Sequence, residues 1–338
     1  MRTITSLIAI LLVGACIAAP ASDKDDDGPL IISKEFYIKD LIKYSSEHDI
    51  VKVMVPLNSI NFDDSESSES NSSEEGDVLI FFVEADADEN GDRVYKGLYS
   101  FKNGKAKKIL ENGRDAAASA DDSKQVFFGA SDGIYVYNQK DDSAEKYGSV
   151  DDSIIGIAKE KTGDVIYILS DNHIVYKISE NGTKKEKLED IVNAKQIVLD
   201  FADNLYFYSD DKVPHIRSAE GVKKIEGLPS NPSYAELVRP PFLLEDGVLF
   251  VSDRVSYILY ANGTSEHSGF EIKSDARPSA YAPDGALVQY YAYDKKIYEY
   301  NVLKLMLGTD LDDLNNFFSE KSEEIRSVAA KSKSSLRH

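Results

Sequence analysis

The sequence contains very little cysteine, no tryptophan and few histidines. Its 338 residues include one cysteine and five histidines. The cysteine, Cys16, lies in segment 1–18, where an early arginine, a short apolar stretch and small residues are typical of a secretory signal peptide. Its removal would leave a mature chain that can form no disulfide, so the core would have to stabilise the fold unaided. The histidines show no metal-ligand spacing, and we expect no metal and no cofactor.

Long apolar runs are also missing. The apolar stretch of the signal peptide is too short to span a bilayer, and no later segment reaches about 18 apolar residues. The formal net charge is −20, and much of it lies in segment 19–28 and in a serine-rich loop at 63–76, both predicted to be disordered. This balance argues against nucleic acid and anionic membranes as partners, because phosphates require clustered lysine and arginine. The sequence therefore predicts a soluble, secreted protein.

Three glycosylation sequons fall in predicted turns or loops. They begin at Asn71, Asn181 and Asn262, each followed by a permitted residue and then serine or threonine. In a secreted chain we expect at least one of them to carry a glycan.

A strand-like segment recurs along the chain. Six runs are rich in aromatic and β-branched residues and end in aspartate: DVLIFFVEAD (77–86), QVFFGASD (125–132), DVIYILSD (164–171), NLYFYSD (204–210), GVLFVSD (247–253) and ALVQYYAYD (286–294). The aspartates are 39 to 46 residues apart, and most runs are followed by another short strand pattern. Short strands repeating at this period are typical of a β-propeller. We predict an all-β fold, a six-bladed β-propeller over residues 29–301.

The ends of the ring need closing, because an open ring exposes sheet edges. Segment 30–38 (LIISKEFYI) is predicted to supply the outer strand of the last blade. Segment 302–338 has a different texture, with apolar residues at helical spacing and a basic tail, and predicts a C-terminal α-helical extension. This helix would pack on the propeller or bind a protein partner.

Sequence motifs for catalysis are weak. GASDG (129–133) matches the nucleophile-elbow pattern, but a strand follows it where a helix is required, so no catalytic residue is predicted. DADENG (86–91) resembles half of a calcium loop, but it joins strands and lacks the closing glutamate. The strand-ending aspartates are predicted to fix turns through backbone N–H groups, with ligand contact as the alternative.

A set of cations suggests a binding site. Counting back from the predicted turns places one cation at the start of the first strand in four blades: Arg114, Lys195, Arg239 and Arg277. First strands line the channel of a propeller, so these cations would converge at one mouth and concentrate positive potential there. The simpler interpretation is that they pair with the strand-ending aspartates on the same face.

The repeated phrases resemble a known family. ASDGIYVYNQKDDSAEKYG (130–148), DFADNLYFYSDD (200–211) and GDVIYILSDN (163–172) are similar to the repeats of lepidopteran ommochrome-binding proteins. The resemblance covers roughly residues 77–300. It implies a non-enzymatic haemolymph protein that binds a planar aromatic pigment, with the four cations holding its carboxylates and Tyr281 stacking on its rings. Two alternatives remain open: a structural, matrix or partner-binding propeller, and a metal-dependent lactonase or esterase of the gluconolactonase kind.

Overall fold

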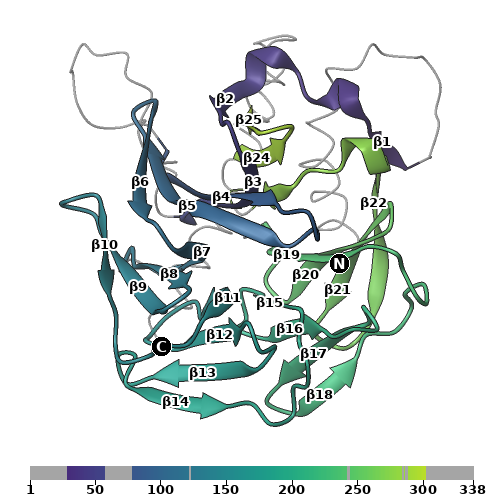
Figure 1. Cartoon of the computed structure of the whole chain (residues 1–338). Helices are drawn as coiled ribbons and strands as arrows, with labels where there is room; N and C mark the ends of the chain where they lie inside the picture. The colour runs from purple at the N-terminus through teal and green to yellow at the C-terminus, as the bar shows by residue number, and fades with distance from the viewer. Residues whose placement is uncertain are drawn as a thin grey trace, which may run out of the picture.

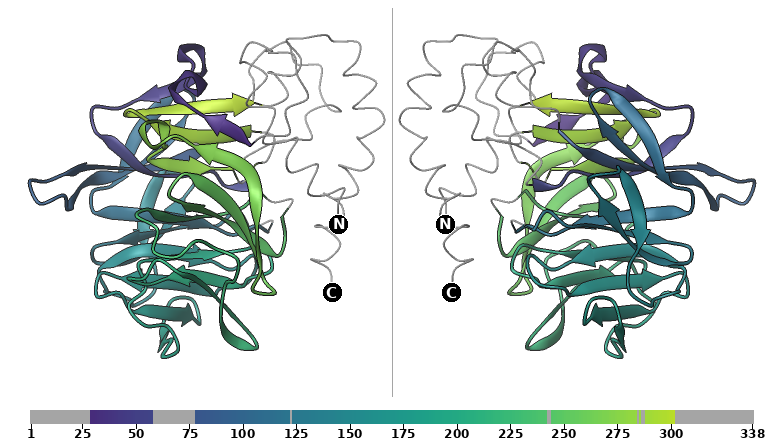
Figure 2. Two further views of the ribbon diagram at one scale, coloured as in Figure 1. Left: turned by 90° about the vertical axis from the view of Figure 1, so that its right-hand side faces the viewer. Right: turned by 90° about the vertical axis from the view of Figure 1, so that its left-hand side faces the viewer.

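Six β-sheets surround a central channel. The computed structural model describes residues 29–57, 78–121, 123–241, 244–283, 285 and 288–301. Each blade has four antiparallel strands, of which the first lies innermost, and one blade carries an additional parallel strand (Figure 1). Viewed from the side, the strands run from one face of the ring towards the other (Figure 2). The all-β, six-bladed propeller predicted from the repeat is therefore confirmed.

The blades follow one another in chain order. Blade 1 consists of β3 (Asp49–Met54), β4 (Ile80–Ala87), β5 (Arg93–Lys102) and β6 (Lys105–Leu110). Blade 2 consists of β7 (Gly113–Ala118), β8 (Val126–Ala130), β9 (Gly133–Asn138) and β10 (Ser143–Lys146). Blade 3 consists of β11 (Ile154–Lys159), β12 (Ile166–Ser170), β13 (Val175–Ser179) and β14 (Lys184–Lys187). Blade 4 consists of β15 (Gln196–Leu199), β16 (Leu205–Tyr208), β17 (Pro214–Ser218) and β18 (Gly221–Lys224).

The last two blades include N-terminal strands. Blade 5 consists of β19 (Ala235–Val238), β20 (Gly247–Ser252), β21 (Val255–Tyr260) and β22 (Ser265–Ile272), with β1 (Leu30–Ile32) added in parallel to β22. Blade 6 consists of β23 (Ala280–Ala282), β24 (Val288–Tyr293) and β25 (Lys296–Asn301), with β2 (Ile42–Ser45) as its outer strand. Three 3-10 turns connect these parts: η2 (Lys34–Phe36), η3 (Lys39–Leu41) and η5 (Ser274–Ala276).

Ring closure by the N-terminal segment needs a correction. Segment 30–38 does not supply the outer strand of the last blade; that strand is β2, while residues 30–32 extend blade 5. Between them, Phe36 stacks on Tyr300 of blade 6, with ring centroids 4.3 Å apart. The C-terminal helix predicted within 302–338 lies outside the described residues, as do segments 1–18, 19–28 and 63–76 and the sequon at Asn71.

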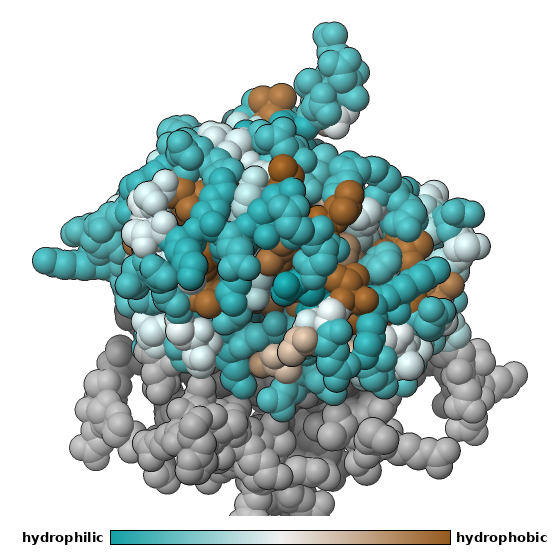
Figure 3. All heavy atoms as spheres, turned by 90° about the horizontal axis from the view of Figure 1, so that it is seen from below, coloured by the Kyte–Doolittle hydropathy of each residue, from teal (hydrophilic) through white to brown (hydrophobic). Residues whose placement is uncertain are grey.

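The core lies between neighbouring blades. The aspartate-ending runs form the second strands of the blades, and those of blades 2, 3 and 5 are buried along their whole length. Both faces of such a strand pack against other blades, which explains near-continuous apolar runs where alternation would mark a half-exposed strand. Outer strands are polar, as in the fully exposed β14, and the side of the ring in Figure 3 is mostly hydrophilic with scattered hydrophobic residues.

Candidate ligand-binding mouth

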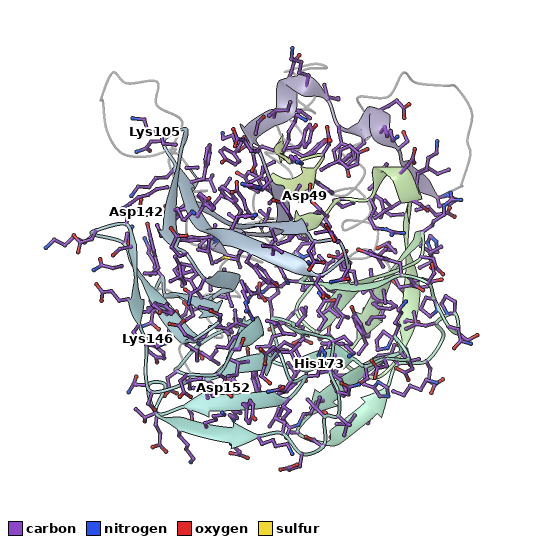
Figure 4. The ribbon with its side chains drawn as sticks, viewed as in Figure 1. Asp49, Lys105, Asp142, Lys146, Asp152 and His173 are labelled. Carbon is purple, nitrogen blue, oxygen red and sulfur yellow. The ribbon has the colours of Figure 1, made fainter. Side chains whose placement is uncertain are left out.

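A pocket of about 530 Å³ opens on the face where the first strands begin, which we call the entry face. Its size lies in the range of small-molecule sites, roughly 300–1,000 Å³. Its charged and aromatic lining consists of Asp49, Lys52, Arg93, Asp115, Lys195, Tyr208, Tyr234, Glu236 and Arg277. Asp49 accordingly lies nearer the centre of the ring than the peripheral Asp142 and Lys146 (Figure 4). We call this cavity the mouth pocket.

The mouth pocket continues into a narrower channel cavity of about 110 Å³. Both cavities are lined by Lys52, Asp115, Gln196 and Glu236, so these residues form the passage between them. Asp115 is 3.6 Å from the Lys52 ammonium and accepts a hydrogen bond from the backbone N–H of Ile157 in the next blade. Such contacts hold neighbouring first strands together and leave these two charges largely satisfied.

Gln196 joins two other first strands. Its side-chain amide donates to the backbone carbonyl of Leu237 at 2.7 Å and accepts from the Leu237 N–H at 2.8 Å. Both hydrogen-bonding groups of the amide are thus used between blades 4 and 5. We assign Gln196 a structural role in the passage.

Arg277 is the most strongly positioned cation of the mouth. Its guanidinium carbon lies 3.6 Å from the ring centroid of Tyr234, and one Nη donates to the Asp253 carbonyl at 2.6 Å. Its Nε is buried and has no hydrogen-bond partner in the part of the chain described. A buried donor without a partner is costly. Because this atom is closed to solvent, a ligand in the mouth pocket would meet other parts of the Arg277 guanidinium and not the Nε.

A glutamate lies beside this arginine. The hydroxyl of Tyr234 donates to the Glu236 carboxylate. Burial raises the pKa of the Glu236 carboxyl, and the Tyr234 hydrogen bond and the charges of Lys52, Arg93 and Arg277 oppose that rise. Glu236 itself is half-buried and lines the pocket. The mouth pocket therefore combines several cations with an acid, and it can accommodate a ligand carrying groups of both signs.

The structure brings together two of the four predicted cations. Lys195 and Arg277 line the mouth pocket. Lys195 is 2.9 Å from the strand-ending Asp210, which is the pairing expected in the simpler interpretation. Arg114 donates to the Ser153 hydroxyl at 2.9 Å and lies over the ring of Tyr95.

The predicted placement of Arg239 is wrong. Arg239 follows Val238, the last residue of β19, so it lies at the end of a first strand and not at its start. It lines the inner channel and lies over the Phe201 ring at 4.9 Å. The residues after it, Pro240 and Pro241, cannot continue a strand, so β19 ends earlier than expected. Counting back from the turn before β20 therefore placed the start of the first strand too far along the chain.

Tyr281 lines the inner channel and not the mouth pocket. One face of its ring is stacked on Tyr291, with centroids 4.3 Å apart, and its hydroxyl donates to Gln289 at 2.9 Å. The aromatic side chains of the mouth are instead Tyr208 and Tyr234, which the sequence alone did not single out. Tyr208 is the last residue of β16 and Tyr234 directly precedes β19. An aromatic residue at the entry-face end of a strand is therefore the sequence signal that indicates them.

Other predicted features have structural roles. Asp86 contacts His48 at 2.7 Å, and Asp88 accepts from the backbone N–H of Asn90 and Asp92, so the supposed calcium loop is a hydrogen-bonded turn. No group of three histidine, cysteine, aspartate or glutamate residues suited to a metal occurs in the described ranges. Within the same ranges, no helix is long and apolar enough to cross a membrane.

Comparisons with known proteins add a likeness of fold. No family model matches the chain, and no curated protein matches it. Among solved structures, that of U3-55K is similar with a TM-score of 0.48 and 11% identity, covering 74% of this chain and 76% of that one. The WD40 repeats of RRP9 are similar with a TM-score of 0.47 and 11% identity, covering 74% and 75%. The class defined by the strand order is a six-bladed β-propeller.

Proposed function

We propose that this chain is a secreted, non-enzymatic binding protein whose mouth pocket holds a planar aromatic carboxylate of the ommochrome-pigment type. The observation that carries the proposal is Arg277, which lines the mouth pocket with its guanidinium held 3.6 Å from the ring centroid of Tyr234. A ligand carboxylate in the pocket could pair with this guanidinium, and the tyrosines of the pocket offer surfaces for aromatic rings. The predicted signal peptide and the resemblance of the repeats supply the secretion and the pigment class.

Titration of xanthommatin into the wild type and the Arg277→Ala variant tests the proposal. A charge-assisted hydrogen bond contributes about 1.5–3 kcal/mol, so its loss should weaken binding by about 10- to 150-fold. The matched control is Lys185→Ala, because Lys185 also lies over a tyrosine ring, at 4.1 Å from Tyr176, but on the outer strand of blade 3. The control should bind like the wild type. Equal affinity in Arg277→Ala and the wild type would refute the assignment.

A partner-binding propeller is the second candidate. Exposed large hydrophobic residues are few in the described part of the chain, and two of them, Val94 (43% exposed) and Val192 (72%), lie on the entry face. A protein loop carrying an acidic side chain could cover them while its carboxylate enters the mouth pocket. An absorption spectrum and a native mass of protein from its natural source separate the candidates. Colour supports the pigment carrier, whereas a colourless complex that Val192→Asp dissociates supports the partner-binding propeller.

A further inference from the structure

The β4–β5 hairpin of blade 1 is longer than its counterparts. β4 and β5 contain 8 and 10 residues, whereas the second strands of the other blades contain four to six. The extra length comes after a register shift between Glu84 and Ala85, where pairing continues to Ala87 and Arg93. In Figure 1 this hairpin runs across the front of the ring towards β19. It therefore reaches the mouth pocket from blade 1.

Gly97 accounts for the bend. It lies opposite Glu84 at the register shift and has φ +126°, a conformation that side-chain-bearing residues rarely adopt. A Cβ at this position would meet the Lys108 side chain at 3.0 Å and the carbonyl of Leu110 at 3.2 Å. A bulge with one strand bent in this way re-aims the residues beyond it. Glycine at position 97 thus turns the hairpin towards the channel.

The base of the hairpin is fixed by charged contacts. The Asp86 carboxylate lies 2.7 Å from Nδ1 of His48 and 3.5 Å from the Lys96 ammonium. Glu84, 3% exposed, accepts a hydrogen bond from the Ser46 hydroxyl. These contacts tie β4 to the chain just before β3, so the hairpin is held in one orientation at its base.

The bend delivers Arg93 to the mouth pocket. Arg93 lies at the first position of β5 and lines the pocket together with Tyr208 and Glu236 of blades 4 and 5. It is exposed and makes no ion pair or hydrogen bond within the residues that the structure places. An arginine with five donors and no partner, held over a cavity, is suited to a carboxylate.

We infer that the β4–β5 hairpin is the specificity element of the mouth pocket: Gly97 bends it, His48 and Asp86 fix its base, and Arg93 selects ligands that carry a carboxylate. The inference rests on the proposed function in that both need the mouth pocket to bind a ligand. It adds that selection for charge comes from blade 1, through a residue that is separate from Arg277.

Binding of 2-naphthoate and 2-naphthamide, which differ in charge but share a ring system, measures this selection. We expect the wild type to prefer the carboxylate. Arg93→Gln should reduce that preference about tenfold by weakening naphthoate alone. Gly97→Val should also reduce the preference for naphthoate, although Arg93 is still present, because the hairpin loses its bend. Arg254→Gln is the matched control, since Arg254 is an exposed arginine of blade 5 whose partner is Glu271 and which does not line the pocket.

A second measurement needs no bound ligand. The chain has no tryptophan, so Tyr208→Trp places a single fluorophore in the pocket wall. Quenching by iodide relative to neutral acrylamide reports the local anion concentration, and adding Arg93→Gln should lower that ratio. An unchanged preference in both hairpin variants, or an unchanged quenching ratio, would overturn the inference. If the wild type binds neither naphthalene compound nor pigment, the proposed function fails, and the quenching ratio alone decides whether Arg93 makes the pocket attract anions.

Discussion

Asp200 should make the protein less stable as the pH rises. Its carboxylate lies in the turn between β15 and β16, is 1% exposed, and accepts hydrogen bonds from the N–H groups of Ala202 and Asn204 and from the Asn204 side-chain amide. Burial nevertheless dominates and raises the pKa of this carboxyl to about 6 from an ordinary 3.8, against the effect of those hydrogen bonds. The folded state therefore holds a proton over a range in which the unfolded chain has released it.

The sign and size follow from this difference. Because the folded pKa is raised, the stabilising protonation is fully present below the unfolded pKa and is lost as the pH rises through about 6. The whole shift of about two units corresponds to about 3 kcal/mol, at about 1.4 kcal/mol per unit. An experiment between pH 8 and pH 5 stays above the sequence pI of 4.7. It covers about one pH unit below the folded pKa of about 6, which corresponds to a change in stability of about 1.4 kcal/mol.

Urea unfolding of the wild type and the Asp200→Asn variant at several pH values measures the effect. The wild type should lose about 1.4 kcal/mol of stability between pH 5 and pH 8 that the variant does not lose. The free energy of unfolding of the variant minus that of the wild type should therefore be about 1.4 kcal/mol larger at pH 8 than at pH 5. Asp253→Asn serves as control: hydrogen bonds from Ser233 and Tyr234 hold the pKa of Asp253 below its usual value, so it stays ionised across this range. A difference between Asp200→Asn and the wild type that does not change with pH would refute the reasoning.

Three further substitutions test the packing of the ring. A Cβ at Gly148 would lie 2.2 Å from the carbonyl oxygen of Gly182, whereas one at Gly163, with a similar positive φ, meets nothing within 4 Å. Gly163→Ala should thus lower the free energy of unfolding by about 1 kcal/mol, for its backbone conformation alone. Gly148→Ala should lower it by about 2 kcal/mol more, because a strand connection has to move. Equal losses of stability in urea unfolding would contradict this. Phe36→Ala should cost about 3 kcal/mol, since the ring is 9% exposed and stacked on Tyr300, and an unchanged melting temperature would show that the N-terminal segment does not hold blade 6.

The propeller could be predicted because its second strands carry a strong local signal. Runs such as IYILS (166–170) are buried along their whole length and are followed by aspartate, so the repeat is visible without tertiary information. The closing strand gave no such signal. Segments 30–32 and 42–45 are both short and partly apolar, and the choice between them depends on which sheet edge each one meets. That information lies in the partner strand and not in the segment.

The mouth pocket could be predicted only in part, for a related reason. A count of cations at first-strand entrances finds Lys195 and Arg277, because both are near strand starts whose position the repeat defines. It misplaces Arg239, because the connection after β19 is longer than the repeat allows. It cannot find Arg93, which reaches the pocket from a hairpin that is bent at Gly97, several residues further along the chain.

The choice between a ligand site and structural pairing is answered residue by residue. Lys195 has Asp210 at 2.9 Å and Lys52 has Asp115 at 3.6 Å, so much of the electrostatic attraction of these lysines is already used inside the protein. A lysine that is already paired leaves little net positive field for a ligand. Arg277 and Arg93 contact no carboxylate within hydrogen-bonding distance among the described residues. If the pocket binds an anion, affinity should therefore depend on the two arginines and hardly on the two lysines.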